Sequence, residues 1–189
     1  MSELPENIYL QATDALNQGG VIAYPTESCF GLGCDPDNEQ AVEKILEFKQ
    51  RPKEKGVILI ASDYSQLTRY IDDKAIPQDK RYQVFSHWPG PFTLLLPIKK
   101  GVPDFLTGQF DTLAVRVTAH PIARELCRRF GKPIVSTSAN LSGQDSAKSA
   151  QEVANVFGTQ LDYILAGSIG ASDKPSTIIN PLTQEVFRS

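Results

Sequence analysis

The segment Ile134-Val135-Ser136-Thr137-Ser138-Ala139-Asn140 joins a short apolar run to a series of small hydroxyl and amide side chains. The residues before it, Pro121 to Phe130, have a proline near the first turn and Gly131 past the end, which is typical of an α-helix. We therefore predict a helix, then a buried strand at Ile134-Val135, and then a polar loop from Ser136 to Asn140. A polar loop at the end of a strand is a common place for a binding site.

Helix-like and strand-like stretches alternate along the rest of the chain, with no linker, low-complexity tract or internal repeat. Strands are predicted at Val21 to Tyr24, Val57 to Ala61, Phe92 to Pro97 and Leu113 to Val117, with further short strands between Tyr163 and Phe187. Predicted helices include one ending near Gln18, one that carries Lys49 at its C-terminal end, and Val153 to Phe157, whereas Pro25 to Gly33 is expected to be a glycine-punctuated turn. We predict an α/β fold of mixed α+β character, a single domain over residues 1–189 in which one twisted, largely mixed β-sheet carries flanking helices.

Length and composition are those of an ordinary globular domain. The chain has 189 residues, of which 41% are hydrophobic and 22% are charged, so disorder is excluded on composition. Residues 1–10 lack the basic start and apolar run of a signal peptide, and no stretch reaches the roughly 20 apolar residues that span a bilayer. The cysteines are odd in number and not spaced as a disulfide framework, which favours a reducing compartment. We expect a cytoplasmic protein that does not associate with a membrane.

Charge is distributed unevenly along the chain. The formal net charge of −3 argues against a domain built for general capture of nucleic acid. Basic residues nevertheless gather between Lys44 and Lys55, and again between Arg124 and Lys132. The second group is interpreted as a solvated helix face. The first group is a better candidate for a binding site, because Pro52 forces Arg51 out of helical geometry and into an extended loop.

Lys49 and Arg51, together with Ser138 and Asn140, are suited to a nucleoside triphosphate. Two fixed cations compensate the negative charge of the phosphates, while serine and asparagine side chains and nearby N–H groups fix the orientation of the ligand. The chain contains no G-x-x-x-x-G-K-[ST] loop. We therefore expect side chains from distant segments, rather than one glycine loop, to hold the phosphates of ATP.

Several short motifs occur in order along the chain. They are Tyr24-Pro25-Thr26-Glu27 with Gly31-Leu32-Gly33, Lys49-Gln50-Arg51-Pro52, Ala114-Val115-Arg116-Val117, Ser136-Thr137-Ser138-Ala139-Asn140 with Ser142-Gly143, Pro175-Ser176-Thr177 and Phe187-Arg188. Each motif is weak alone, but in this order they resemble the YrdC-like threonylcarbamoyl-AMP synthases, specifically the short bacterial TsaC type. The resemblance covers almost the whole chain and implies a YrdC-like fold.

The resemblance implies a nucleotidyltransferase. Its reaction would convert L-threonine, bicarbonate or CO2, and ATP into L-threonylcarbamoyladenylate and diphosphate, the first step of N6-threonylcarbamoyladenosine modification of tRNA. A separate threonylcarbamoyl-transferase complex would complete the modification. Mg2+ is expected to arrive with ATP, and no tightly bound prosthetic group is expected. No protein metal site is expected either, because His87 and His120 do not stand in a metal-ligand spacing.

The resemblance also implies roles for individual residues. The catalytic set would be Lys49, Arg51, Ser138 and Asn140, and these residues together with Ser146 and Arg188 would bind ATP. Threonine would be bound by Thr26, Ser28, Arg116, Ser136 and Ser176. Arg116 would pair with the threonine carboxylate, because a guanidinium offers a bidentate geometry that an ammonium lacks.

The chain departs from the longer relatives just after the Lys49 to Pro52 motif. Those relatives carry an Asp-Asn-Pro stretch there and a histidine after the next strand, whereas this chain has Glu54-Lys55-Gly56 and Ile60. The ligand contacts made at these positions are therefore left open, including whether Lys55 replaces one contact to phosphate.

Two other functions are also left open. One is a module that binds double-stranded RNA or tRNA without catalysis, although the chain has no aromatic-rich RNA-binding strand and is acidic overall. The other is a related carbamoyl-adenylate-forming enzyme with another substrate, as in the YrdC-like domain of hydrogenase maturation proteins. Because one fold can serve any of these functions, the site residues have to decide between them.

Overall fold

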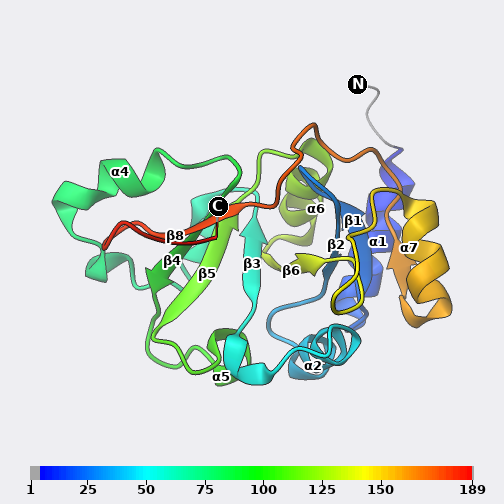
Figure 1. Ribbon diagram of the computed structural model, residues 1–189, viewed down its shortest axis with the longest axis horizontal. Helices are drawn as coiled ribbons and strands as arrows, with labels where there is room; N and C mark the ends of the chain where they lie inside the picture. The colour runs from blue at the N-terminus through cyan, green and yellow to red at the C-terminus, as the bar shows by residue number, and fades with distance from the viewer. Residues whose placement is uncertain (1–4, 189) are drawn as a thin grey trace.

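The structure is a computed structural model that describes residues 5–188 (Figure 1). Its strands are β1 (Ile22–Pro25), β2 (Phe30–Gly33), β3 (Ile58–Ala61), β4 (Phe92–Pro97), β5 (Thr112–Val117), β6 (Ile134–Ser138), β7 (Tyr163–Ile164), β8 (Thr177–Asn180) and β9 (Glu185–Arg188). They form a nine-stranded sheet in the order β7-β1-β2-β6-β3-β5-β4-β8-β9. The pairs β1–β7, β3–β5 and β4–β8 are parallel and the others are antiparallel, so the predicted mixed sheet is confirmed.

Helices flank this sheet (Figure 1). The longer ones are α1 (Glu6–Asn17), α2 (Glu39–Phe48), α6 (Pro121–Phe130) and α7 (Ala150–Phe157), and the shorter ones are α3 (Tyr64–Leu67), α4 (Arg81–Phe85) and α5 (Asp104–Thr107). Four 3-10 turns complete the list: η1 (Lys53–Lys55), η2 (Asp73–Ala75), η3 (Gln78–Lys80) and η4 (Gly158–Gln160). Within the described residues, no helix combines the length and the apolar character needed to cross a membrane.

Alternate residues of each strand pack on opposite faces of the sheet, as the pleat of a β-strand requires. Along β1, Ile22 and Tyr24 are buried against α1 and α6, whereas Ala23 belongs to a second cluster that includes α2 and α7. In β3, Ile60 belongs to the first cluster and Leu59 to the second. The sheet therefore separates two hydrophobic clusters, one on each face.

The face that carries α1 and α6 is only partly covered by helices. Residues paired directly across strands point to the same face, so Arg116, which pairs with Ile60, shares the face of that isoleucine. The same rule places Ser136 with its partner Ile58. Ile58, Ile60, Arg116 and Ser136 line a cavity, so the uncovered part of this face is the floor of a pocket.

The helix predicted over Pro121 to Phe130 is confirmed as α6. The His120 side chain accepts a hydrogen bond from Ala123 N at its start, and Gly131 adopts the left-handed conformation with a φ of 81° at its end. Both signals lie within the helix or next to it, so the local sequence was sufficient to locate it.

The turn predicted over Pro25 to Gly33 is wrong. Its ends belong to β1 and β2, which form an antiparallel hairpin with Tyr24 opposite Gly31, and only the residues between the strands turn. Gly33 is needed for packing rather than for turning, because a Cβ there would lie 2.7 Å from the Tyr24 ring. The glycines therefore let strand β2 pass close to a buried tyrosine.

The loop predicted from Ser136 to Asn140 is also partly wrong, because β6 continues to Ser138. Ser136 pairs with Ile58 of β3 and Ser138 pairs with Gly31 of β2, so this polar run has a strand on each side. Those partners come from distant parts of the sequence and outweigh the turn preference of serine. Only Ala139 and Asn140 lie beyond the strand.

Candidate functional site

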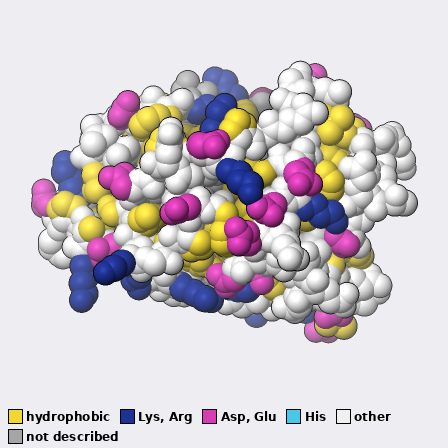
Figure 2. Space-filling view, turned by 90° about the horizontal axis from the view of Figure 1, so that it is seen from below, with side chains coloured by type: hydrophobic (Ala, Val, Ile, Leu, Met, Phe, Trp, Pro, Cys, Tyr) yellow, Lys and Arg dark blue, Asp and Glu magenta, His cyan; other side chains and the backbone are white. Residues whose placement is uncertain are grey.

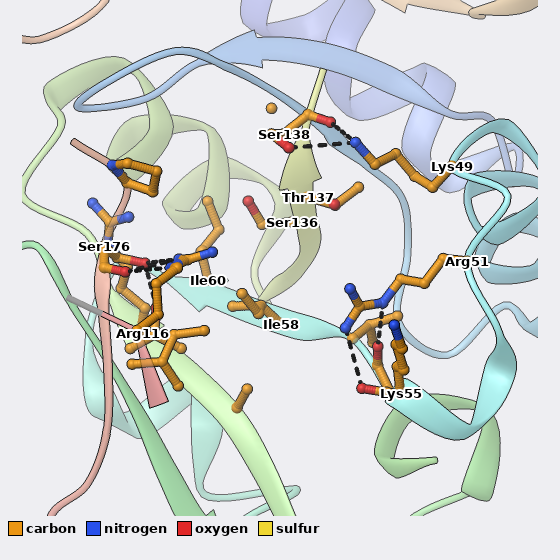
Figure 3. Close-up of a pocket in the computed structure, with 18 of the residues that line it drawn as sticks. Lys49, Arg51, Lys55, Ile58, Ile60, Arg116, Ser136, Thr137, Ser138 and Ser176 are labelled. Carbon is orange, nitrogen blue, oxygen red and sulfur yellow. Dashed lines mark hydrogen bonds between the residues drawn. The ribbon is translucent and has the colours of Figure 1, made fainter. Parts of the chain in front are cut away.

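The uncovered face of the sheet forms the floor of a cavity of about 760 Å³ (Figure 3). This volume lies within the range of roughly 300–1,000 Å³ that small-molecule sites occupy. All residues predicted for ATP or threonine binding line it: Thr26, Ser28, Lys49, Arg51, Arg116, Ser136, Ser138, Asn140, Ser146, Ser176 and Arg188. In Figure 3, Lys49 and Arg51 lie on one side of the cavity, and Arg116 lies on the other.

Lys49 follows the last residue of α2 and reaches across to the end of β6. Its Nζ donates hydrogen bonds to the main-chain oxygens of Ser138 and Asn140, each at 2.8 Å, and to Ser138 Oγ at 3.3 Å. Asn140 Oδ1 is a further acceptor. Lys49 therefore connects the end of a helix to the loop after β6 and fixes where that loop starts.

Asn140 orders the loop that follows β6. Its Oδ1 accepts a hydrogen bond from Ser138 Oγ at 2.7 Å, and its Nδ2 donates to the main-chain oxygens of Leu141 at 3.1 Å and Gln144 at 2.7 Å. Both ends of the amide are thus bonded within the protein. Ser146, further along the loop, lines the cavity, so Asn140 shapes the backbone that leads to this serine.

Arg51 lies outside α2, as predicted, and is held by the turn that follows it. The chain leaves the helix through Gln50, which has a φ of 46°. Arg51 Nε donates to Gly56 O and its Nη2 donates to Lys55 O, both at 3.2 Å. Gly108 supports this turn, because a Cβ on it would lie 2.7 Å from Gly56 N. Partial burial lowers the pKa of the Arg51 guanidinium, although the residue as a whole is exposed.

Arg116 lies on β5 and is only 8% exposed. Its Nε donates to Gly90 O at 3.1 Å, and its Nη2 forms an ion pair with Glu27 Oε2. Burial alone would raise the pKa of Glu27, but the charge of Arg116 and a hydrogen bond from Thr118 outweigh it and hold that pKa below its usual value. Glu27 was not among the site residues predicted from the sequence, although a buried arginine needs such a partner.

Ser176 joins two other residues of the cavity. Arg188 of β9 donates to Ser176 O through Nε at 2.9 Å and through Nη2 at 2.8 Å, and to Ser176 Oγ at 3.0 Å. The Ser176 hydroxyl also shares a hydrogen bond of 2.8 Å with Thr93 Oγ1. Burial, and then the nearby charge of Arg116, lowers the pKa of Arg188. The two guanidinium groups therefore lie within electrostatic reach of each other.

The predicted threonine-binding hydroxyl groups have different environments. Thr26 Oγ1 donates to Cys29 O at 2.7 Å in the turn between β1 and β2. Ser28 is half-buried, and its hydroxyl lies 3.8 Å from the Cys29 sulfur. Ser136 lies near Tyr24, whose pKa is raised by burial despite a hydrogen bond with this serine. The hydroxyl proton of Thr26 is thus bonded within the turn, and its lone pairs remain for a ligand.

The cavity has cations on two sides and hydroxyl groups between them. Lys49 and Arg51 face it from the end of α2, Arg116 faces it from the other side, and Ser136 lies between them on the floor (Figure 3). Arg188, which is hydrogen-bonded to Ser176, also lines the cavity. Among residues 5–188, no group of three or more His, Cys, Asp or Glu side chains could hold a metal ion. Fold and site define a mixed α/β protein with a pocket for small anionic molecules.

Comparison with known proteins narrows this class to one family. Residues 14–189 match the profile of the Sua5, YciO and YrdC proteins, which carries the description "Telomere recombination". Threonylcarbamoyl-AMP synthase from Idiomarina loihiensis is 59% identical over 178 residues, which cover 94% of this chain and 96% of the relative. The chain belongs to the Sua5/YciO/YrdC family.

Solved structures of this family have the same fold. The P. abyssi Sua5 structure complexed with L-threonine is 36% identical, with a TM-score of 0.85 over 95% of this chain and 52% of that chain. This chain therefore spans about half the length of that relative. E. coli YciO is 31% identical, with a TM-score of 0.81 over 100% of this chain and 91% of that chain. The predicted YrdC-like architecture is confirmed.

Proposed function

We propose that this protein is a threonylcarbamoyl-AMP synthase, a nucleotidyltransferase that uses L-threonine, bicarbonate or CO2, and ATP. The observation that supports it most is the arrangement of charge in one cavity, with Lys49 and Arg51 on one side and Arg116 on the other (Figure 3). Such a cavity suits two anionic reactants held at the same time. The 59% identical synthase and the Sua5 complex with L-threonine support the same function.

The chemistry explains why several cations are required. The threonine amine captures CO2 and loses a proton, which gives a carbamate. A carbamate oxygen then attacks the α-phosphorus of ATP, the bond from this phosphorus to the bridging oxygen breaks, and diphosphate leaves. Lys49 and Arg51 would bind the triphosphate and the leaving diphosphate, and Arg116 would bind the threonine carboxylate. Positioning and charge compensation are the main contributions expected from a protein in this kind of reaction.

The remaining predicted residues divide between the two ligands. Ser138, Asn140, Ser146 and Arg188 would contact the nucleotide, and Thr26, Ser28, Ser136 and Ser176 would surround threonine. Mg2+ would enter with ATP and offset part of its charge. Lys55 also lines the cavity, and we propose that it adds positive charge near the phosphates in place of the residues that longer relatives carry there.

The distribution of charge on one face of the molecule does not favour RNA binding there. Figure 2 shows one face of the molecule, on which basic and acidic side chains are intermingled. This face offers no continuous basic surface for a phosphate backbone. We propose that the protein works in the cytoplasm, and that a separate threonylcarbamoyl-transferase complex carries the product to tRNA.

The test is diphosphate formation from ATP by the purified protein, with threonine and bicarbonate omitted one at a time. Turnover that requires both supports the proposed function. Turnover that requires a different amine would assign the protein to a related adenylate-forming enzyme. Folded protein without turnover, which binds RNA in a strongly salt-dependent way, would favour the non-catalytic alternative.

The ATP affinity should depend on pH through Lys49. Burial, the main cause, lowers the pKa of this ammonium to about 8. Because a triphosphate binds the charged form, we expect the Kd for ATP to increase as pH rises through about 8. Calorimetry in buffers of different ionisation enthalpy should show proton uptake on ATP binding near that pH. The Lys49→Arg variant stays charged and should lose this dependence; an identical pH profile in both proteins would contradict the assignment.

A further inference from the structure

Glu27 and Arg116 form a buried ion pair, and each of the two side chains also has a hydrogen-bond partner outside the pair. Arg116 Nε donates to Gly90 O at 3.1 Å, while its Nη2 contacts Glu27 Oε2. Nη2 and Oε2 are buried and have no other hydrogen-bond partner among the described residues. A guanidinium has more N–H donors than these two contacts use. Neither contact uses Nη1 of Arg116, so the donors of this atom are left for a ligand in the cavity that the residue lines.

Glu27 is itself held in place by the surrounding backbone. Its Oε1 accepts hydrogen bonds from Thr118 Oγ1 at 2.8 Å and from Ala119 N at 3.1 Å. Its main-chain oxygen accepts from Ser172 N at 3.0 Å. A Cβ on Gly170 would lie 2.7 Å from the same oxygen, so the chain packs closely against it. The carboxylate thus has a fixed position from which it can orient a longer side chain.

We infer that Glu27 is a positioning residue, which holds the Arg116 guanidinium in the orientation that binds the carboxylate of threonine. This inference rests on the proposed function. An arginine side chain has many rotamers, and a cation without a partner beside Arg188 would also be repelled by its charge. Pairing with a fixed carboxylate restricts the rotamers of Arg116 and offsets the repulsion from Arg188 before the ligand arrives. Less ordering of the side chain is therefore required when the ligand binds.

Glu27→Gln tests this inference. The glutamine keeps the size of the side chain and an oxygen for Thr118, but it places an N–H donor against the donors of Arg116. We expect the KM for threonine to increase by roughly 30-fold or more, while the KM for ATP changes by less than about two-fold. Threoninol, in which a hydroxymethyl group replaces the carboxylate, should inhibit the wild-type protein far more weakly than threonine binds, and the variant should lose most of this discrimination.

Glu185→Gln is the matched control. Glu185 is exposed on β9 and is not among the residues that line the cavity, and no hydrogen bond or ion pair of its side chain is found among the described residues. This variant removes the same charge as Glu27→Gln without touching Arg116, and both KM values should stay unchanged. Thermal unfolding establishes that each variant is folded. If Glu27→Gln does not fold, Thr118→Val, which removes one hydrogen bond to Glu27, should give a smaller increase that is still selective for threonine.

Three results would overturn the inference: a threonine KM in Glu27→Gln close to that of the wild type, equal increases for threonine and ATP, or tighter threonine binding. The last result would mean that Glu27 competes with the ligand for Arg116 rather than positioning it. Wild-type protein that binds no threonine would instead overturn the proposed function. Direct titration of the wild type with threonine therefore separates the two failures.

Discussion

Lys49→Ala is expected to lower kcat/KM for ATP by about 10²–10³-fold, the range seen when a single preorganised charged or donor group is removed from a reaction site. The variant would lose the ammonium that is proposed to compensate the charge of the triphosphate. It would also lose the hydrogen bonds that connect α2 to Ser138 and Asn140. Diphosphate release at low ATP concentration, with saturating threonine and bicarbonate, measures the effect.

Lys44→Ala provides the control on the same helix. The Lys44 side chain is exposed and pairs at 3.2 Å with Asp162. Exposed pairs of this kind contribute only about 0–1 kcal/mol, so stability and turnover should both be close to those of the wild type. If Lys49→Ala keeps an activity similar to that of Lys44→Ala, the ammonium does not take part in ATP binding.

Arg116→Ala is expected to lower the free energy of unfolding by about 3–5 kcal/mol at neutral pH, because it leaves the buried Glu27 carboxylate without its cation. Threonine binding should weaken by about 10²-fold or more, since the guanidinium is the proposed partner of the threonine carboxylate. Urea unfolding measures the first effect, and titration with threonine measures the second.

The stability loss should depend on pH in a defined direction. In the wild type, Arg116 holds the pKa of Glu27 below its usual value, so the pair contributes stability above about pH 4 that is lost as pH falls through the folded-state pKa. In Arg116→Ala, the hydrogen bond from Thr118 remains but the charge of Arg116 is lost, so burial shifts that pKa upward relative to the wild type. The stability deficit should therefore shrink as pH falls from about 7 towards about 4, because Glu27 becomes protonated. A deficit that does not change with pH would contradict this explanation.

Arg116→Lys separates charge from geometry. The lysine keeps a cation near Glu27 but loses the planar fork of donors. Most of the stability should be retained, whereas the KM for threonine should still increase. An unchanged threonine KM would show that Arg116 does not bind the threonine carboxylate.

The parts of the fold that could be predicted depend on local signals. The ends of α6 are marked by Pro121 and Gly131, and α2 is marked by its apolar spacing and by the Asn38 cap, whose side chain accepts a hydrogen bond from Ala41 N. Strand β2 and the end of β6 have no such signals. They are strands because Gly31 pairs with Tyr24 and Ser138, which lie on both sides of it in the sheet.

The candidate site, like the fold, could be predicted from the sequence only in part. The side chains with charge or hydroxyl groups could be selected from their motifs, and the structure brings them together in one cavity. The interactions between them could not be predicted, because they connect distant residues: Glu27 contacts Arg116, Arg188 contacts Ser176, and Lys49 contacts Asn140. An arginine within a buried strand requires a carboxylate partner, and Glu27 is a carboxylate close to the end of a strand. This combination is the signal in the sequence that could have identified Glu27.

The order of strands in the sheet has a consequence for the rate of folding. The floor of the cavity depends on parallel pairs between distant residues, such as Ile60 with Arg116 and Phe92 with Thr177. A pair of this kind forms only after a long loop has closed, and loop closure costs entropy before the contacts of the pair stabilise the chain. Proteins dominated by such pairs fold slowly. During refolding, helices such as α6 should therefore form well before threonine can bind, and ligand binding should report completion of the whole sheet.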